Sequence, residues 1–359
     1  MSLLRVYVGA YTQDLGWVKG KAKGVALYKL DPATGKMTKL SEVASNNPSF
    51  LSIHPSGKFL FATNESNKLD PSSDNAISAF AIAEDGALSL LNQQASLGGN
   101  PVFVSVEPTG KFAVTANYTG GNFVMYPIGE DGKLAEASDN SMHSGSGPDK
   151  DHPQGPHAHS ISIAPGGKYA LGCDLGLDKV FIYQLDLTNG RLLPHDIVIA
   201  GGSGPRHLAF HPNEKYVYVI NEMGGTITAF AWDGAAGLLS EMQTISTVPA
   251  NYTGPKPRCA DVHVHPNGKF IYGSNRGDDS IVVYGVDQAT GQLILLGHES
   301  TQGKTPRNFA LTPVGALLLV ANQDSSNVVV FRVDSDTGKL TLMATNDIPT
   351  PACLKFACM

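Results

Sequence analysis

The sequence predicts an all-β protein folded as a seven-bladed β-propeller, in which each blade is a four-stranded antiparallel sheet. A turn of the type Pro-x-Gly-Lys recurs six times, with its prolines at Pro55, Pro108, Pro165, Pro212, Pro266 and Pro313. These prolines are on average about 52 residues apart, a period typical of propeller blades, and 359 residues hold about seven such units. No segment shows the apolar period of an amphipathic helix.

Each unit contains segments with strand character in a fixed order. A short apolar strand precedes the turn, as at 48–53 and 205–210. A second strand follows the turn and ends in Asn or Asp, as at 59–64 and 216–221. The third strand is predicted at 76–82, 179–185, 226–232, 280–286 and 327–333. A fourth strand is expected after turns rich in Asp and Gly, at 31–36, 84–86, 130–133 and 336–339.

The two ends of the chain supply the seventh unit. The segment 351–356 matches the first strand of a unit and then stops, whereas 6–12 resembles a second strand. Pairing the C-terminal strand with the N-terminal strands closes the ring and removes exposed sheet edges, which would otherwise invite aggregation. We therefore expect one propeller domain over residues 1–359.

Composition narrows the function classes. A net charge of −6 disfavours a nucleic-acid partner, which selects a basic surface. The four cysteines (Cys173, Cys259, Cys353 and Cys358) form no C-x-x-C pair, and we expect reduced, mostly buried thiols. No N-terminal signal peptide and no apolar run of about 20 residues is present, so we expect a cytoplasmic protein without a membrane partner.

The longest irregular stretch is 139–156, which is rich in Ser, Gly, Pro and Asp. Loops of this length in a compact domain are commonly functional or disordered. Because the stretch ends directly before Pro156-His157-Ala158-His159, we expect it to form a lid over a site.

The repeat itself predicts where a site lies. Residues six before the turn proline and ten after it should face each other across a hairpin, at the rim of one mouth of the central channel. The first column contains Ser49, Val102, His159, Arg206, Ala260, Arg307 and Ala352. The second column contains Tyr11, Glu65, Tyr118, Leu175, Glu222, Arg276 and Gln323. One arc of this rim therefore has three arginines, a histidine and a carboxylate. The like charges on the arc would raise one another's electrostatic energy unless an anion lies between them.

Structural explanations compete with this interpretation. Arg206 and Glu222 can form a simple inter-strand ion pair. His54, His211 and His265 occupy one repeat column beside the turn proline, and we expect them to be structural. His263 and His265 resemble a metal-binding pair, but no carboxylate or cysteine cluster joins them, so no metal site is expected.

Several catalytic motifs are missing from the sequence: a G-x-S-x-G elbow, a Walker sequence, H-E-x-x-H and a Rossmann glycine fingerprint. A serine triad, a nucleotide-binding loop and a zinc protease are therefore disfavoured. An acid or base, a histidine and guanidinium groups that bind oxyanions remain. This set suits the addition of water to an acyl group of an anionic substrate, without a cofactor.

The same residues carry a family resemblance over almost the whole chain. The segments concerned are 154–160, 174–180, 204–212, 221–222, 274–277, 305–307 and 321–323. In order and content they resemble the seven-bladed propeller lactonase family, which includes 6-phosphogluconolactonases and fungal carboxy-muconate lactonizing enzymes. The resemblance implies metal-free hydrolysis of 6-phosphogluconolactone, a small anionic sugar lactone, in the oxidative pentose phosphate route. A histidine, two arginines and a glutamate proposed for the muconate branch match His159, Arg206, Glu222 and Arg276.

These residues have distinct candidate roles. Glu222, or His159 in its place, would act as general base, and Arg206 would stabilise the oxyanion. Arg276 and Arg307 would hold the substrate phosphate or carboxylate. The candidate substrate-binding residues are His157, Arg307 and Gln323. Two alternatives stay open, a lactonizing cycloisomerase of the carboxy-muconate type and a non-enzymatic propeller scaffold.

Overall fold

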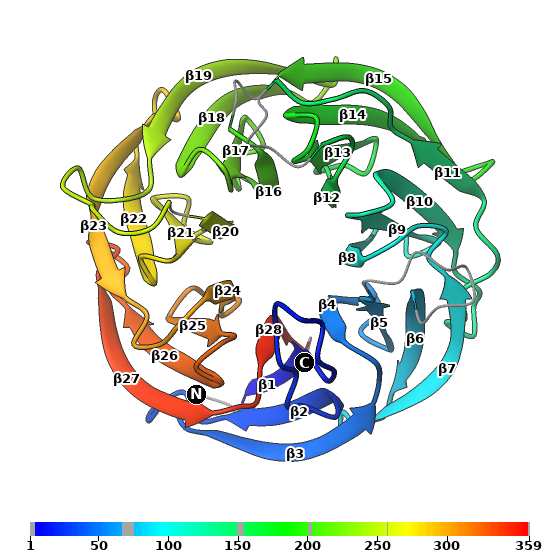
Figure 1. The fold of residues 1–359 in the computed structure, drawn as a ribbon, viewed down its shortest axis with the longest axis horizontal. Helices are drawn as coiled ribbons and strands as arrows, with labels where there is room; N and C mark the ends of the chain where they lie inside the picture. The colour runs from blue at the N-terminus through cyan, green and yellow to red at the C-terminus, as the bar shows by residue number, and fades with distance from the viewer. Residues whose placement is uncertain (1–3, 67–74, 149–153, 200–202, 257, 358–359) are drawn as a thin grey trace.

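The computed structural model describes residues 4–66, 75–148, 154–199, 203–256 and 258–357. Over these ranges, 28 strands form seven four-stranded antiparallel sheets arranged as a ring (Figure 1). The predicted fold class, a seven-bladed β-propeller, is confirmed. Nothing in the described ranges is a helix of the length and hydrophobicity that crossing a membrane requires.

The strands of each blade run in order from the central axis to the outside. The innermost strands are β4 (Pro48–Ile53), β8 (Pro101–Val106), β12 (Ala158–Ile163), β16 (Pro205–Phe210), β20 (Arg258–Val264), β24 (Pro306–Leu311) and β28 (Pro351–Phe356). The second strands are β1 (Leu4–Ala10), β5 (Phe59–Asn64), β9 (Phe112–Asn117), β13 (Tyr169–Asp174), β17 (Tyr216–Asn221), β21 (Phe270–Arg276) and β25 (Leu317–Asn322).

The outer half of each blade completes the sheet. The third strands are β2 (Gly24–Leu30), β6 (Ala76–Ile82), β10 (Asn122–Pro127), β14 (Lys179–Asp186), β18 (Thr226–Asp233), β22 (Ser280–Val286) and β26 (Asn327–Val333). The outermost strands are β3 (Met37–Ala44), β7 (Leu88–Ala95), β11 (Asp139–Met142), β15 (Arg191–Ile199), β19 (Leu238–Ser246), β23 (Leu293–Ser300) and β27 (Leu340–Asp347).

The two ends of the chain meet in one blade, as predicted. Strand β28 pairs antiparallel with β1, with Phe356 opposite Val6 and Cys353 opposite Gly9 (Figure 1). The blade therefore takes its innermost strand from the C-terminus and its other three strands from the N-terminus. A hydroxyl–carbonyl hydrogen bond from Thr350 to Tyr11 (2.7 Å) extends the junction beyond the strands.

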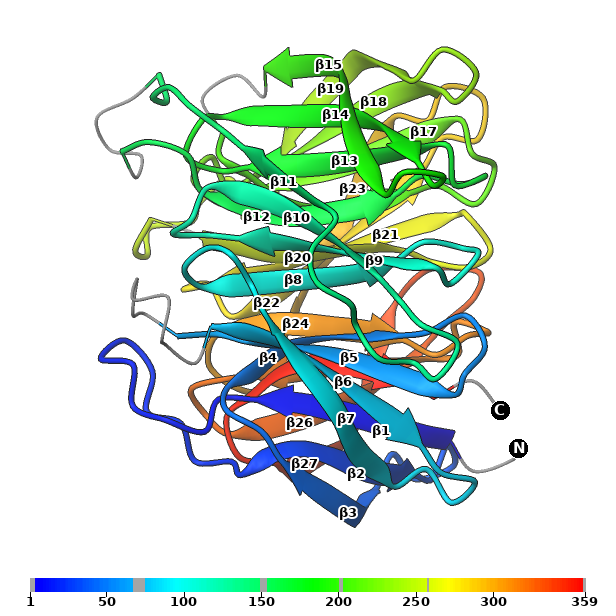
Figure 2. The ribbon, with the colours of Figure 1, turned by 90° about the vertical axis from the view of Figure 1, so that its right-hand side faces the viewer.

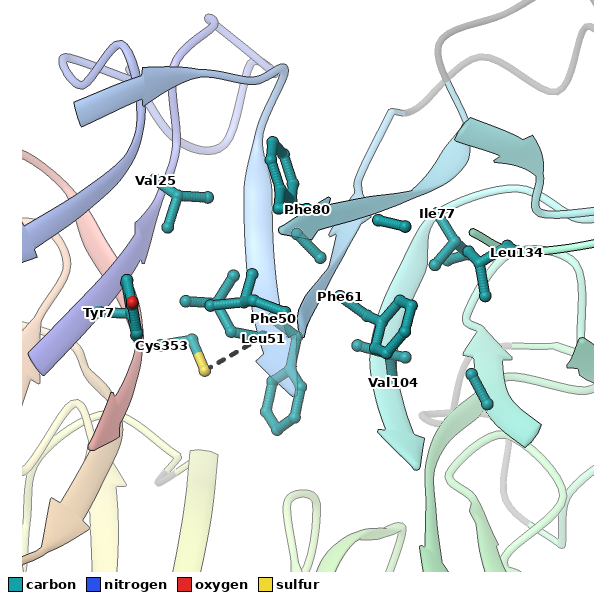
Figure 3. Packing of buried hydrophobic residues seen from close by; sticks show 14 of the residues in the cluster. Tyr7, Val25, Phe50, Leu51, Phe61, Ile77, Phe80, Val104, Leu134 and Cys353 are labelled. Carbon is teal, nitrogen blue, oxygen red and sulfur yellow. Dashed lines mark hydrogen bonds between the residues drawn. The ribbon is translucent and has the colours of Figure 1, made fainter. Parts of the chain in front are cut away.

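The hydrophobic core lies between neighbouring blades. Strand β9, for example, is buried along its whole length, because adjacent blades cover both of its faces. Figure 3 shows one such interface, where Leu51 packs near Cys353 and its amide donates a hydrogen bond to Cys353 Sγ at 3.4 Å. Cys173, Cys259 and Cys353 are free and buried, as expected, and Cys358 lies outside the described residues.

The histidines beside the turn prolines join one blade to the next. A ring nitrogen Nε2 meets a turn carbonyl of the following blade in three pairs: His54 with Gly110 (2.9 Å), His211 with Gly268 (2.8 Å) and His265 with Gly315 (3.2 Å). A Cβ on Gly110 would lie 2.3 Å from His54 Nε2, so this close contact requires glycine. The structural role predicted for these histidines is confirmed.

The interpretation of 139–156 as a lid is wrong for its first part. Residues Asp139–Met142 form β11, the outermost strand of their blade, paired with β10. This strand is short, polar and partly exposed, so it lacks the apolar signal by which strands are recognised in a sequence. The next residue, His143, is held by Asp174 (2.6 Å) and Tyr183 (2.9 Å). Residues 149–153 lie outside the described residues.

Closure of the ring can be tested by truncation. Deleting 350–359 removes β28 and leaves β1 as an unpaired inner edge next to two opened blade interfaces. We expect the thermal midpoint measured by circular dichroism to fall by at least about 10 °C, or folding to fail, because a core strand rather than a tail is lost. A chain ending at Ala357 is the control and should keep the wild-type midpoint. An unchanged midpoint after the longer deletion would contradict the closure.

Candidate functional site

Polar side chains converge where the innermost strands begin and the second strands end. The loop after β1 projects from this face, which is opposite the start of β1 and the end of β28 (Figure 2). A pocket of about 220 Å³ opens here, lined by Trp17, Glu65, Asn100, Val102, Tyr118, His159, Glu222, Arg258, Arg276 and Arg307. A cavity of about 10 Å³ adjoins it and adds Arg206 and His207, further along the innermost strands. The structure thus brings His159, Arg206, Glu222, Arg276 and Arg307 together.

A β-bulge near the start of the innermost strand positions three of these residues, His159, Arg206 and Arg307. Pro205 pairs with Asn221 and His207 pairs with Ile220, so Arg206 has no direct partner on β17. The predicted opposition of Arg206 and Glu222 in the strand register is therefore wrong, although both lie at the rim. Equivalent bulges contain His159 in β12 and Arg307 in β24. A bulge leaves one residue outside the ladder and redirects its side chain, which a count from the turn does not reveal.

Glu222 holds two arginines side by side. Its Oε2 atom lies 3.0 Å from Arg206 Nε and 2.6 Å from Arg276 Nη2. The Arg206 contact is an ion pair without hydrogen-bond geometry at Nε, because that N–H is not aimed at the carboxylate. Carbonyl groups of β20 fix both guanidinium groups further, with Arg206 Nη1 donating to Ala260 and Arg276 Nη2 donating to Cys259 at 3.0 Å. The carboxylate thus offsets the repulsion between two cations.

Burial and charge set the protonation states of this group. Burial, together with nearby Arg276, lowers the pKa of Arg206 to about 9, which still leaves it protonated at neutral pH. Burial by itself would raise the pKa of Glu222, but Arg276 and Arg206 outweigh this effect and lower the pKa. Glu222 is therefore an ionised carboxylate and a weak base.

His159 is a neutral imidazole in the same pocket. Burial lowers its pKa well below the usual value, and the positive charge of Arg206 adds to this effect. The ring lies edge-on to Tyr118, with 5.6 Å between centroids, and edge-on to His207 at 5.3 Å. Among the described residues, none forms a hydrogen bond with the buried Nδ1 atom of His159. His159 is therefore unprotonated at neutral pH.

Two aromatic rings hold Arg307. Its guanidinium carbon lies 4.8 Å from the ring centroid of Trp17 and 5.5 Å from that of Tyr11. Such cation–π contacts orient a guanidinium group without neutralising it. The Tyr11 hydroxyl donates to Glu65 Oε2 at 2.8 Å, which brings a second carboxylate to this side of the pocket. Sequence reasoning did not assign Trp17, because it lies in the irregular loop after β1 and outside the repeat columns.

A second polar network lies further along the innermost strands. Asp261 accepts from His207 Nδ1 at 2.8 Å and from Asn308 Nδ2 at 2.5 Å, and its Oδ2 lies 3.0 Å from His263 Nε2. His263 thus pairs with Asp261, while His265 joins the neighbouring blade. In the ranges that the structure covers, no three His, Cys, Asp or Glu side chains gather as a metal site would need. Sequence reasoning did not identify this network.

Two predicted residues do not line the pocket. The ring nitrogen Nδ1 of His157 lies 3.1 Å from the carbonyl oxygen of Tyr118, and its backbone amide donates to Asp174. The Gln323 side chain donates to Asp324 Oδ1 at 2.8 Å. The described residues of 139–156 do not line the pocket either, so the geometry gives no support to a lid.

The buried His207 makes stability depend on pH. Burial, with Arg206 nearby, lowers its pKa to about 4, whereas the unfolded value is about 6.5. The unfolded chain therefore takes up a proton first, and stability is lost as the pH falls from about 6.5 toward 4. At pH 5 we expect this residue to account for a loss of up to about 2 kcal/mol.

Urea unfolding between pH 5 and pH 7.5 measures this loss. The variant His207→Asn should show a smaller decrease of unfolding free energy with falling pH than the wild type. The matched control is His195→Asn, because His195 is an exposed histidine on the outermost strand β15. If the wild type and His207→Asn lost stability equally with falling pH, the protonation state assigned to His207 would be wrong.

Comparison with known proteins places this geometry in a family. The model of the family "Lactonase, 7-bladed beta-propeller" matches residues 5–356. The 6-phosphogluconolactonase of Bacillus subtilis (strain 168) is 34% identical over 354 residues, which cover 98% of this chain and 97% of that protein. The 6-phosphogluconolactonase of Formosa agariphila is 37% identical over 323 residues, with 88% of each chain covered.

Solved structures agree with this result. The periplasmic gluconolactonase PpgL of Pseudomonas aeruginosa is similar with a TM-score of 0.91 and 31% identity, over 99% of both chains. The family match and the similarity of the curated relatives each extend over most of this chain. The chain therefore belongs to the seven-bladed β-propeller lactonase family.

Proposed function

We propose that the protein hydrolyses 6-phosphogluconolactone to 6-phosphogluconate, in the cytoplasm and as a step of the oxidative pentose phosphate route. The observation that carries the proposal is the group of Arg206, Arg276 and Glu222 beside a neutral His159, at the end of a pocket lined by further arginines. The names of the relatives and their similarity along the chain support the same substrate.

Arg206 would stabilise the charge that develops on the lactone carbonyl oxygen. Attack of water on the carbonyl carbon turns this oxygen into an oxyanion, and a fixed cation in a buried site stabilises such a charge strongly. Arg206 is 2% exposed, and contacts with Glu222 and the Ala260 carbonyl fix its position before substrate arrives. Pre-arranged donors need no reorganisation during the reaction.

His159 is the better general base of the two candidates. Both arginine contacts fall on the Oε2 atom of Glu222, so we assign this carboxylate the role of counter-ion for the two cations. Neutral His159 would take a proton from the attacking water and return it to the ring oxygen as the carbon–oxygen bond breaks. The net reaction adds one water and yields a carboxylic acid, which ionises at neutral pH.

The remaining cations would bind the substrate. Arg276 and Arg307 face the same pocket and can hold the anionic group of the lactone. His157 and Gln323 lie outside the lining, and we propose that His157 acts indirectly, by holding the Tyr118 main chain beside His159.

Hydrolysis can be measured directly in a pH-stat with 6-phosphogluconolactone, corrected for spontaneous hydrolysis. We expect the wild type to accelerate the reaction. Arg206→Ala and Glu222→Gln should each lower kcat by about 100-fold, because one removes the oxyanion donor and the other leaves two buried cations without their counter-ion. Absence of hydrolysis above the spontaneous rate in the wild type would refute the proposed function and favour a scaffold or a cycloisomerase.

The two neighbouring histidines provide a sharper test of the mechanism. His159→Gln should lower kcat by at least about 100-fold, whereas His157→Gln should cost less than about tenfold, since only His159 lines the pocket. The low pKa of His159 also predicts that kcat at saturating substrate stays constant as the pH falls through 6.5, because the base remains unprotonated. Equal losses in the two variants would show that His159 is not the base.

A further inference from the structure

We propose that Arg258 is the residue that selects phosphorylated lactones, by binding the substrate phosphate at the outer rim of the pocket. This inference rests on the proposed function and adds a specificity-determining residue to it. Arg258 occupies neither of the two repeat columns, so the pattern of the sequence did not single it out.

Arg258 lies beside the arginines already assigned to the site. It begins β20 and is paired with Arg276 on β21, and Arg276 Nε donates to the Arg258 carbonyl oxygen at 3.2 Å. Both side chains line the pocket. Arg206 is buried, Arg276 is half-buried and Arg258 is exposed, so the guanidinium groups extend from the inner cavity to the mouth.

The charges of the site leave Arg258 without a partner. Arg206 and Arg276 both form ion pairs with Glu222. Arg307 lies over the ring of Tyr11, and the Tyr11 hydroxyl donates a hydrogen bond to Glu65. Within the described ranges, the Arg258 side chain makes neither an ion pair nor a hydrogen bond. The pocket and its adjoining cavity are lined by four arginines and two glutamates, an excess of two positive charges.

A phosphate monoester matches this excess. It carries a charge of about −1.5 to −2 at neutral pH and binds guanidinium groups through paired hydrogen bonds. In the proposed pose the lactone carbonyl lies at Arg206. The ring oxygen, C5 and C6 of the substrate separate the carbonyl carbon from the phosphate group, which can therefore extend toward the mouth of the pocket. An unphosphorylated lactone has no group that would use Arg258.

The experiment compares two substrates that differ only in the phosphate. We would measure kcat/KM for 6-phosphogluconolactone and for gluconolactone with the wild type and Arg258→Gln. A charged hydrogen bond of the usual strength predicts a loss of about 30-fold for the phosphorylated lactone, mainly through KM. Gluconolactone should change by less than about twofold. Arg191→Gln is the matched control, because Arg191 is an exposed arginine on the outermost strand β15.

A binding measurement separates this inference from the proposed function. Titration calorimetry with 6-phosphogluconate and gluconate should show tighter binding of the phosphorylated acid by the wild type, and Arg258→Gln should reduce this difference. If the wild type hydrolyses neither lactone, the proposed function fails and the calorimetry alone decides the role of Arg258. Equal losses for both ligands, or no loss for the phosphorylated ones, would overturn the inference.

Discussion

The pairing of β28 with β1 is the constraint on which the rest of the structure depends. It turns seven blades into a closed ring, so the innermost strands must converge around one axis. Convergence brings residues from distant parts of the chain, such as Tyr11, His159 and Arg307, to one small cavity. Without closure the blades would keep their local pairing, but the opposed arginines would have no fixed separation. The site is therefore a property of the whole ring.

Convergence alone does not produce a usable site, because strand ladders direct side chains in strict alternation. The bulges in β12, β16 and β24 break this alternation at His159, Arg206 and Arg307. Each bulge lies near the start of its strand, while the remainder of the strand keeps regular pairing. The regular pairing keeps the strand rigid, and the bulge gives one side chain a fixed direction that strict alternation would not allow. Catalysis by preorganised groups requires such fixed positions.

The charges of the pocket are only partly neutralised. Glu222 lets Arg206 and Arg276 lie close together, and aromatic rings hold Arg307 without cancelling its charge. The guanidinium groups are therefore held in place, and part of their positive charge remains available to an anionic ligand. Burial and the same arginines keep His159 unprotonated, because both disfavour a second positive charge at this place.

The sequence by itself determined the blade number, the closure and five of the residues that meet at the rim, because a repeat encodes equivalent positions. His159, Arg206, Glu222, Arg276 and Arg307 were predicted in this way, and the structure places all five in the connected cavities. Tertiary structure decided the rest. The sharing of Glu222 by arginines from two blades, the contact of Trp17 with Arg307, and the bulged register depend on relations between segments that no local pattern contains. Side-chain direction at a bulge and contacts between blades are set by packing in three dimensions, and a periodic sequence fixes only which positions are alike.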